Sequence, residues 1–246
     1  MDTYKLTISY DGTNYEGWQK QRRADSVTVQ ETIENALSDL FGIQTKITGA
    51  GRTDSGVHAL AQVASMRAET KIMPEKLLKA INVRLPEDIV ITKVEKTYDN
   101  FHAQKDAKGK HYRYNVYQNP VARAIGRQYC YQMPYPLNED KVRRACKVLE
   151  GTHDFSAFCA SGSEVLTHER TVYKAELTRN GDWWIFDFYG NGFLRNMVRI
   201  MVGTILEIGN ERLALECINE AFLKGERALL GKTAPAKGLW LMEVFY

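Results

Sequence analysis

The spacing of hydrophobic positions along the chain changes between the two-residue period of strands and the longer period of helices. Residues 4–10 alternate as a half-buried strand does, and a turn dipeptide follows them. Thr28 and Glu31 have the spacing of a capping box, and the apolar positions behind them recur at helical intervals as far as Gly42. The first part of the chain therefore predicts a strand followed by a helix.

The same pattern, followed to the end of the chain, predicts two halves of similar element order. In the first half it predicts strands at 44–48, 57–67 and 89–96 and a helix that starts at Pro74 and ends before Pro86. In the second half it predicts strands at 111–117, 170–178, 183–189 and 239–245, helices at 140–149, about 193–208 and about 211–224, and a hairpin turn across Asn180-Gly181.

We therefore predict an α+β protein made of two ferredoxin-like halves, each with a mainly antiparallel sheet. The N-terminal half is expected to span residues 1–104 and the C-terminal half residues 105–246. If the two sheets join edge to edge, a broad concave surface with a central catalytic cleft would run between the halves.

Composition restricts the chemistry to ordinary side chains. No run approaches about 18 consecutive apolar residues, and residues 1–12 predict a strand rather than a secretion signal, so we expect a cytoplasmic protein with no membrane span. The four cysteines form no CxxC pair, the five histidines include no HExxH, and no Gly-rich nucleotide motif is present. We therefore expect neither a metal nor a cofactor.

The net charge of +3 is too small to indicate a nucleic-acid partner by itself, but the cations are clustered. Between Phe101 and Arg127, six cations stand against one anion, with three tyrosines among them. A second cluster consists of Lys20, Arg22 and Arg23. Basic residues interleaved with aromatics suit phosphate contact and base stacking, although a solvated strand face with core tyrosines on its other side predicts the same pattern.

Residues 51–59 (GRTDSGVHA) place one carboxylate, Asp54, between two glycines, beside Arg52 and before His58. These residue types also form ordinary polar turns, which is the simplest interpretation. The alternative is a catalytic loop, in which the glycines allow a tight turn and the close approach of a nucleotide. For His58 we expect a structural hydrogen bond within the loop.

Arg199 lies in the stretch 191–203 (NGFLRNMVRIMVG), whose helix is predicted to be apolar nearly all round and therefore buried. A buried guanidinium needs an anion or a full set of hydrogen bonds. Either Arg199 reaches solvent at a sheet edge, or it pairs with Asp54 across the two halves and keeps that acid ionised as a nucleophile. Gly203, one turn further on, leaves room for another backbone or a ligand.

Six stretches together resemble the tRNA pseudouridine synthase A family: GRTDSGVHA, YDGTNYEGWQKQ, KHYRYNVY, GTHDFSAF, GNGFLRNMVR and GLWLMEVFY. They follow the family's order and span the chain from Tyr10 to Tyr246. Arg195, Ile200 and Met66 depart from the family's usual residues, and none of the three carries a charge or ring assigned to the chemistry.

The resemblance implies isomerisation of uridine to pseudouridine in the tRNA anticodon stem-loop, at tRNA positions 38, 39 and 40, by base flipping and without cofactor or metal. The uracil–ribose carbon–nitrogen bond breaks, the base rotates, and a carbon–carbon bond forms. Whether the acid attacks the base or the sugar, or first removes a ribose proton, stays open. The resemblance also implies a homodimer with the RNA lying across both subunits.

The family's site residues map onto five positions of this sequence. Asp54 corresponds to the catalytic aspartate and Arg199 to its arginine partner. Tyr112 corresponds to the tyrosine that stacks on the target uracil and is also a candidate catalytic base. Arg52 corresponds to an arginine that fills the space of the flipped nucleotide, and Leu239 to an apolar residue of the uracil pocket. A non-catalytic RNA-binding module is the alternative from another class. A nucleoside or glycoside hydrolase is a weaker alternative, because most glycosidases need two carboxylates and only Asp54 has a suitable setting.

Overall fold

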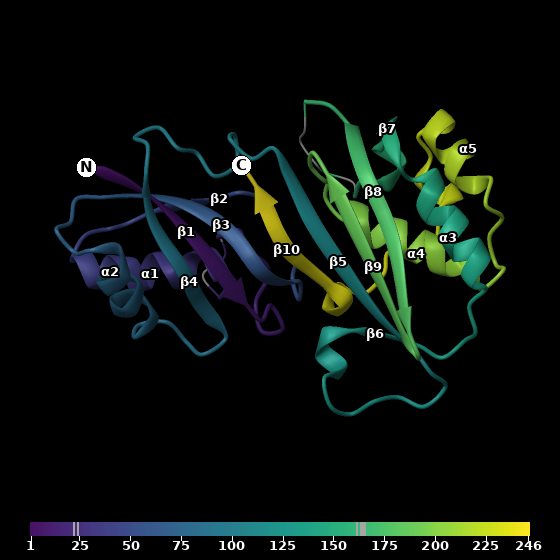
Figure 1. The fold of residues 1–246 in the computed structure, drawn as a ribbon, viewed down its shortest axis with the longest axis horizontal. Coiled ribbons are helices and arrows are strands. Elements are labelled where there is room, and N and C mark those ends of the chain that lie inside the picture. Colours follow the sequence, from purple (N-terminus) through teal and green to yellow (C-terminus); the bar gives the residue numbers. More distant parts are fainter. Residues whose placement is uncertain (22, 24, 161, 163–165) are drawn as a thin grey trace. The chain divides into compact units, whose positions relative to one another are not determined.

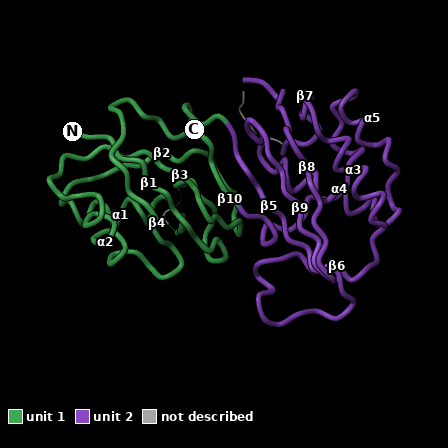
Figure 2. The backbone as a smooth tube through the Cα atoms, in the orientation of Figure 1, with its two compact units in different colours: residues 1–108, 241–246 green, residues 109–240 purple. Residues whose placement is uncertain are grey.

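The computed structural model describes residues 1–246 except 22, 24, 161 and 163–165, so that Arg22 of the second basic cluster lies outside the described residues. The chain divides into two compact units (Figure 2). Unit 1 comprises Met1–Lys108 together with Leu241–Tyr246, and unit 2 comprises Gly109–Trp240. The last six residues therefore group with unit 1, whereas the sequence pattern placed the whole C-terminal strand in the second half.

Unit 1 has the element order that the hydrophobic pattern predicts (Figure 1). Its elements are β1 (Asp2–Tyr10), α1 (Val29–Phe41), β2 (Ile47–Gly49), β3 (His58–Ala68), α2 (Pro74–Asn82) and β4 (Ile89–Thr97). The strands pair in the order β4-β1-β3-β2, and every one of these neighbours is antiparallel. This is the strand order of a ferredoxin-like sheet.

Local signals account for the helix boundaries in unit 1. The Thr28 hydroxyl caps α1 by accepting from the Glu31 amide at 3.3 Å, and Gly42 ends the helix with a φ of 68°. Ile33 and Leu37 of α1 are fully buried, as are Leu6 and Ile8 of β1, so that one side of the helix and one side of the strand contribute to the core. The strand expected at 44–48 is shorter and later than predicted, since β2 covers only Ile47–Gly49.

Unit 2 contains the longest hairpin of the chain. Its elements are β5 (Gly109–Gln118), β6 (Tyr131–Met133), α3 (Glu139–Val148), β7 (Gly151–Asp154), β8 (Glu169–Asn180), β9 (Trp183–Gly190), α4 (Met197–Gly209), α5 (Cys217–Lys224) and the first residues of β10 (Leu239–Phe245). Within the unit the strands run in the antiparallel order β5-β9-β8-β7, and β6 pairs parallel with β5. The prediction of a mixed α+β protein with mainly antiparallel sheets is confirmed.

Three predicted details of unit 2 are wrong by a few residues. The hairpin register pairs Asn180 with Trp183, so the two-residue loop is Gly181-Asp182 and starts one residue later than expected. The helix expected at about 193–208 starts at Met197, because Asn196 adopts a left-handed φ of 62° that a helix interior does not allow. The last helix starts only at Cys217, and the short strands β6 and β7 were not predicted at all.

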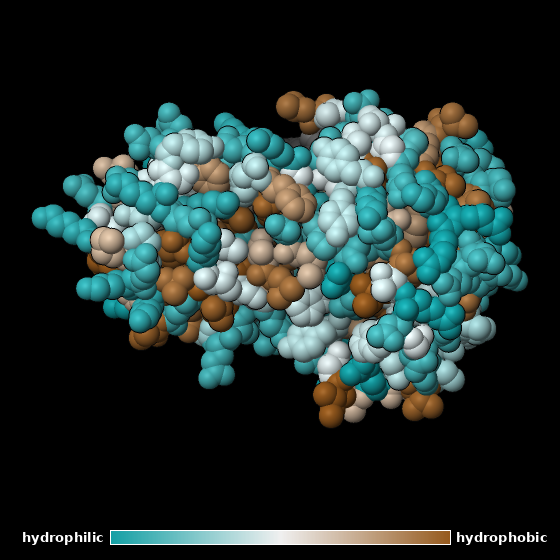
Figure 3. Space-filling view, viewed as in Figure 1, coloured by the Kyte–Doolittle hydropathy of each residue, from teal (hydrophilic) through white to brown (hydrophobic). Residues whose placement is uncertain are grey.

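One face of the molecule shows how polar and apolar side chains are distributed. On the face drawn in Figure 3, hydrophilic side chains predominate, with hydrophobic ones scattered among them. In unit 2, Val121 is 74% and Ile125 is 86% exposed on the segment that precedes β6. None of the helices in the described part of the chain has the length and apolar character needed to cross a membrane.

Candidate active site

The loop that carries Asp54 connects β2 to β3 in unit 1 and is anchored at its first residues. The Ala50 amide donates to the Val63 carbonyl at 2.7 Å, and the Gln62 side-chain amide donates to the Gly51 carbonyl at 2.9 Å. Gln62 is fully buried, so this second bond is shielded from water. The entrance to the loop is therefore fixed to the strand that follows it.

The segment 10–18, which begins at the last residue of β1, holds the centre of the loop. The Trp18 amide donates to the Thr53 carbonyl at 3.1 Å, and the Tyr10 hydroxyl lies 2.8 Å from the Thr53 hydroxyl. On the other side of Asp54, the Gly56 amide donates to the Tyr15 carbonyl at 3.3 Å. Asp54 thus lies between two residues that are both tied to one neighbouring segment.

Burial keeps the Tyr10 hydroxyl protonated, so that it can hydrogen-bond to Thr53. Tyr10 is 3% exposed, and the loss of solvation raises the pKa of its hydroxyl well above the ordinary value for tyrosine. The side chain therefore stays neutral, and its hydrogen bond with Thr53 persists over the whole range of ordinary pH. Tyr15 is held in a similar way, because its hydroxyl donates to the Asp88 carboxylate at 2.5 Å.

Two glycines of the segment 10–18 allow its close contact with the loop. Gly17 has a φ of 90°, and a Cβ on it would lie 2.5 Å from the Thr53 carbonyl oxygen. A Cβ on Gly12 would lie 2.0 Å from the Val57 carbonyl oxygen. No side chain fits at either position without moving backbone. The segment carries part of the family resemblance, but no local sequence pattern indicates that it supports the loop.

Asp54 itself is half-buried, and Arg52 is exposed. The Asp54 carbonyl accepts from the Val57 amide at 3.1 Å, which closes a tight turn through Gly56 at a φ of 76°. His58 is fully buried, and its Nδ1 accepts from the Gly12 amide at 3.1 Å. This bond leads out of the loop to Gly12, whereas a bond within the loop was expected, and it ties β3 to the same segment that holds the loop.

Tyr112 lies on β5 of unit 2, where it pairs with Phe188 of β9. Its side chain is 7% exposed and meets the ring of Phe193 edge to face, with the ring centroids 5.2 Å apart and the planes at 83°. Such edge contacts fix the orientation of an aromatic ring. Phe193 belongs to the turn that leads from β9 to α4.

Arg199 lies in the first turn of α4 and is half-buried. Its Nε donates to the Ala234 carbonyl at 2.8 Å, and its Nη1 donates to the Asn196 side-chain oxygen at 3.1 Å. The Ala234 amide donates in turn to the Arg199 carbonyl at 3.0 Å. Within unit 2 the guanidinium is therefore positioned by two fixed acceptors rather than left to extend freely into solvent.

One segment, residues 231–239, which includes a 3-10 turn at Ala236–Gly238, packs against α4 and β5 and carries Leu239 at its end. A Cβ on Gly203 of α4 would lie 1.7 Å from the Lys232 carbonyl oxygen, so the close approach expected at Gly203 is that of this segment's backbone. The Tyr114 hydroxyl donates to the Pro235 carbonyl at 2.7 Å. Leu239, 6% exposed, ends the segment at the start of β10. No local sequence pattern indicates this segment's role.

The predicted site residues are thus divided between the two units: Asp54 and Arg52 lie in unit 1, and Arg199, Tyr112 and Leu239 lie in unit 2. Among the residues that the structure describes, no group of three or more histidine, cysteine, aspartate or glutamate side chains could hold a metal ion.

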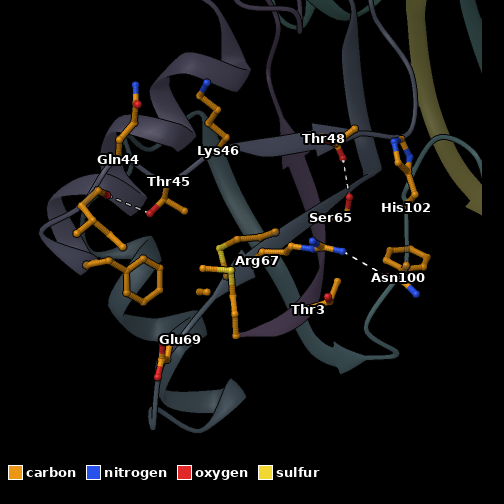
Figure 4. A pocket seen from close by; sticks show the side chains of 16 residues that line it. Thr3, Gln44, Thr45, Lys46, Thr48, Ser65, Arg67, Glu69, Asn100 and His102 are labelled. Carbon is orange, nitrogen blue, oxygen red and sulfur yellow. Dashed lines mark hydrogen bonds between the residues drawn. The ribbon is translucent and has the colours of Figure 1, made fainter.

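A separate pocket of about 560 Å³ lies in unit 1 (Figure 4) and contains none of the predicted site residues. Its labelled polar side chains come from the N-terminus of β1, the residues around β2, the end of β3 and the segment after β4. Arg67 is fixed there by donating to the Asp99 carbonyl at 3.2 Å. The pocket is therefore not the candidate active site.

Comparison with known proteins gives a consistent result over the full chain. The family model described as tRNA pseudouridine synthase matches residues 6–106 and 145–246. The chain is 44% identical to tRNA pseudouridine synthase A of Geobacillus sp. (strain WCH70), over 98% of this chain and 97% of that protein. It is 42% identical to tRNA pseudouridine synthase A of Thermoanaerobacter sp. (strain X514), and 44% identical to that of Acetivibrio thermocellus, in both cases over 100% of each chain.

Matches to solved structures were also found. A chain from the structure of an H/ACA ribonucleoprotein bound to a substrate RNA containing 2′-deoxyuridine is 13% identical, with a TM-score of 0.40, over 82% of this chain and 44% of that chain. A match with so low an identity and TM-score supports no conclusion about this chain. Its membership of the family therefore rests on the sequence matches.

Proposed function

This chain belongs to the tRNA pseudouridine synthase family and is an isomerase; from that premise we propose that it converts uridine to pseudouridine in the tRNA anticodon stem-loop, at positions 38, 39 and 40. The proposal rests on the contacts that hold the Asp54 loop in place. Buried side chains and two obligatory glycines hold the residues on both sides of a single half-buried carboxylate. A plain polar turn needs no such support.

Asp54 is the catalytic carboxylate of the proposed reaction. The carbon–nitrogen bond between uracil and ribose breaks, the base rotates, and the ribose carbon bonds to a ring carbon of uracil, which gives up its proton to the nitrogen side of the ring. Reactant and product have the same atoms and oxidation level, so one carboxylate acting covalently is enough to begin the reaction. Attack on the sugar, attack on the base and initial removal of a ribose proton are all compatible with that role.

Arg199 is the proposed ion-pair partner of Asp54. Its guanidinium has five N–H donors, and the contacts with Ala234 and Asn196 account for two of them. Because these two contacts already fix the guanidinium, pairing with the acid costs little additional conformational entropy of the Arg199 side chain. The pair keeps the carboxylate ionised in a site from which the RNA excludes water.

The other three residues bind the flipped nucleotide. Tyr112 stacks on the target uracil from a ring orientation fixed by Phe193. Arg52 is exposed and occupies the space that the nucleotide leaves in the RNA stack, and Leu239 lines the uracil pocket. Flipping costs a few kcal/mol, which these contacts offset.

The enzyme acts as a cytoplasmic homodimer that binds one tRNA across both subunits. A net charge of +3 gives one chain little cationic surface for a substrate as long as tRNA. A second copy doubles the basic segment between Phe101 and Arg127, which supplies further phosphate contacts.

The test is product analysis after incubation of the protein with uridine-labelled tRNA and digestion to nucleosides. Pseudouridine at positions 38–40 with no free uracil is the expected result. Free uracil would show a hydrolase, and unchanged uridine with tight tRNA binding would show a non-catalytic RNA-binding protein. Pseudouridine at other positions only would reject the anticodon stem-loop as the substrate.

A further inference from the structure

Lys110, at the start of β5, is a half-buried cation with no counterion among the described residues. It carries three donor hydrogens, and no described residue accepts a hydrogen bond from it or forms an ion pair with it. Lysine side chains rarely lose solvent contact unless they are paired. The position therefore carries an energetic cost that the free protein does not recover.

The cation lies on the same face of the sheet as Tyr112. Successive side chains of a strand alternate between faces, and β5 pairs with β9 without a register shift from Lys110 to Tyr117. Lys110, two residues before Tyr112, therefore shares its face. Its cross-strand partner is Gly190, which has no side chain to separate Lys110 from β8.

Arg170 of β8 adds a second positive charge on this face. Gly190 pairs with Val172 of β8 as well as with Lys110, and Arg170 is two residues from Val172. A Cβ on Gly192 would lie 3.7 Å from the Arg170 Nε, so the arginine stem passes over that glycine. Gly190, the last residue of β9, and Gly192, which follows it, thus leave space in which the side chains of Lys110 and Arg170 reach the same area.

The Arg170 guanidinium retains unused donors. Its Nη1 donates to the Thr167 carbonyl at 2.9 Å and to the Glu169 carbonyl at 2.6 Å. In the described part of the chain, no acceptor contacts its Nε or Nη2. The fixed Nη1 holds the planar group in place, and the Nε–Nη2 edge of the guanidinium matches a pair of phosphate oxygens.

The charge of Arg170 makes it less favourable for Lys110 to be protonated. Burial first, and the nearby Arg170 guanidinium second, lower the pKa of Lys110 to about 8. Two like charges close together in a partly water-poor area are unfavourable unless an anion joins them. A phosphodiester supplies that anion, and its oxygens accept from both side chains.

We propose that Lys110 and Arg170 form an anion subsite in unit 2 that holds a phosphate of the RNA backbone beside the nucleotide stacked on Tyr112. The assignment to RNA rests on the function proposed above, whereas the anion site itself does not. Lys110 and Arg170 are positioning residues, because they fix the nucleotide's backbone while Tyr112 contacts the base.

The first experiment titrates inorganic phosphate against thermal unfolding at constant ionic strength. Wild type and Lys110→Arg, which keeps the charge, are expected to show a saturable rise in melting temperature. Lys110→Met, of similar length without charge, is expected to lose that rise. Lys224→Met is the matched control, since Lys224 is an exposed lysine of the same unit and pairs only with Glu220. Equal stabilisation of wild type and Lys110→Met by phosphate would overturn the subsite.

The second experiment measures tRNA turnover and the salt dependence of tRNA binding. Lys110→Met is expected to raise KM about tenfold with kcat within threefold, and to reduce the salt slope of log K by about one, because one phosphate contact is lost. Lys110→Arg should restore KM, and Lys224→Met should change neither value. A KM and salt slope unchanged in Lys110→Met would overturn the assignment to RNA phosphate. If wild type produced no pseudouridine, the proposed function would fail, and the phosphate titration would still decide whether the anion subsite exists.

Discussion

Asp54 is the residue whose chemistry the proposed reaction cannot replace. Asp54→Asn keeps the shape of the side chain and removes the nucleophile, so we expect pseudouridine formation to fall at least a thousandfold while the melting temperature stays within a few degrees. Affinity for tRNA should stay the same or rise, because an anion facing the RNA is removed. Nucleoside analysis and filter binding measure the two effects. Residual turnover within about tenfold of wild type would exclude Asp54 as the nucleophile.

Arg199 combines a structural and a chemical role at the scale of one side chain. Arg199→Ala removes the hydrogen bonds to Ala234 and Asn196 and the proposed partner of Asp54. We expect the free energy of unfolding to fall by about 3 kcal/mol and turnover to fall at least a hundredfold. Urea denaturation checks stability, with the exposed Arg195→Ala as control. An Arg199→Ala protein with wild-type stability and turnover would contradict both roles.

The effect of Lys110 on the free energy of unfolding is expected to depend on pH. Its pKa of about 8 in the folded protein is below its ordinary value of 10.5, so the unfolded chain binds more protons between these values. The lysine therefore destabilises the fold fully below pH 8, and the penalty disappears as the pH rises to 10.5. Without phosphate, Lys110→Met should be more stable than wild type at pH 7, by up to about 3 kcal/mol. The difference should vanish near pH 10.5, and a pH-independent difference would contradict the shift.

At the scale of elements, the segment 10–18 and the loop between β2 and β3 behave as one unit. Gly17→Ala would place a Cβ 2.5 Å from the Thr53 carbonyl at a φ of 90°, so one backbone must move. We expect a loss of at least about 2 kcal/mol in stability and a larger loss in kcat than in tRNA affinity. Gly42→Ala is the matched control, because its φ of 68° is also positive but nothing lies within 4 Å. Equal effects of the two substitutions on kcat would show that the segment does not position Asp54.

At the scale of the whole molecule, charge and assembly decide how a long RNA is held. We expect light scattering to show a symmetric dimer and tRNA affinity to fall at least a hundredfold between 50 and 200 mM salt, because phosphate contacts release counterions. Binding at the two salt concentrations tests the second part. A monomer that modifies full-length tRNA at the wild-type rate would refute the dimer and leave the Asp54 chemistry unaffected.

Features encoded within a few neighbouring residues were determined by the sequence alone. The alternation of 4–10, the Thr28 cap and the Gly42 stop predict β1 and α1 correctly, because strand period, capping and left-handed ends depend on local geometry. The GRTDSGVHA stretch indicated the candidate loop for the same reason, whereas the bond between His58 and Gly12, 46 positions away, was not indicated by it.

The contacts that position the candidate site were decided only by the tertiary structure. Gly17 against Thr53, Ala234 against Arg199 and Pro235 against Tyr114 join residues from about 35 to more than 100 positions apart. Such pairs leave no periodic trace, because either partner alone fits an ordinary turn, helix or strand. The pattern that predicts a helix from about 193 likewise did not show that Asn196 adopts a left-handed φ before Met197, or that Phe193 packs against Tyr112 of β5.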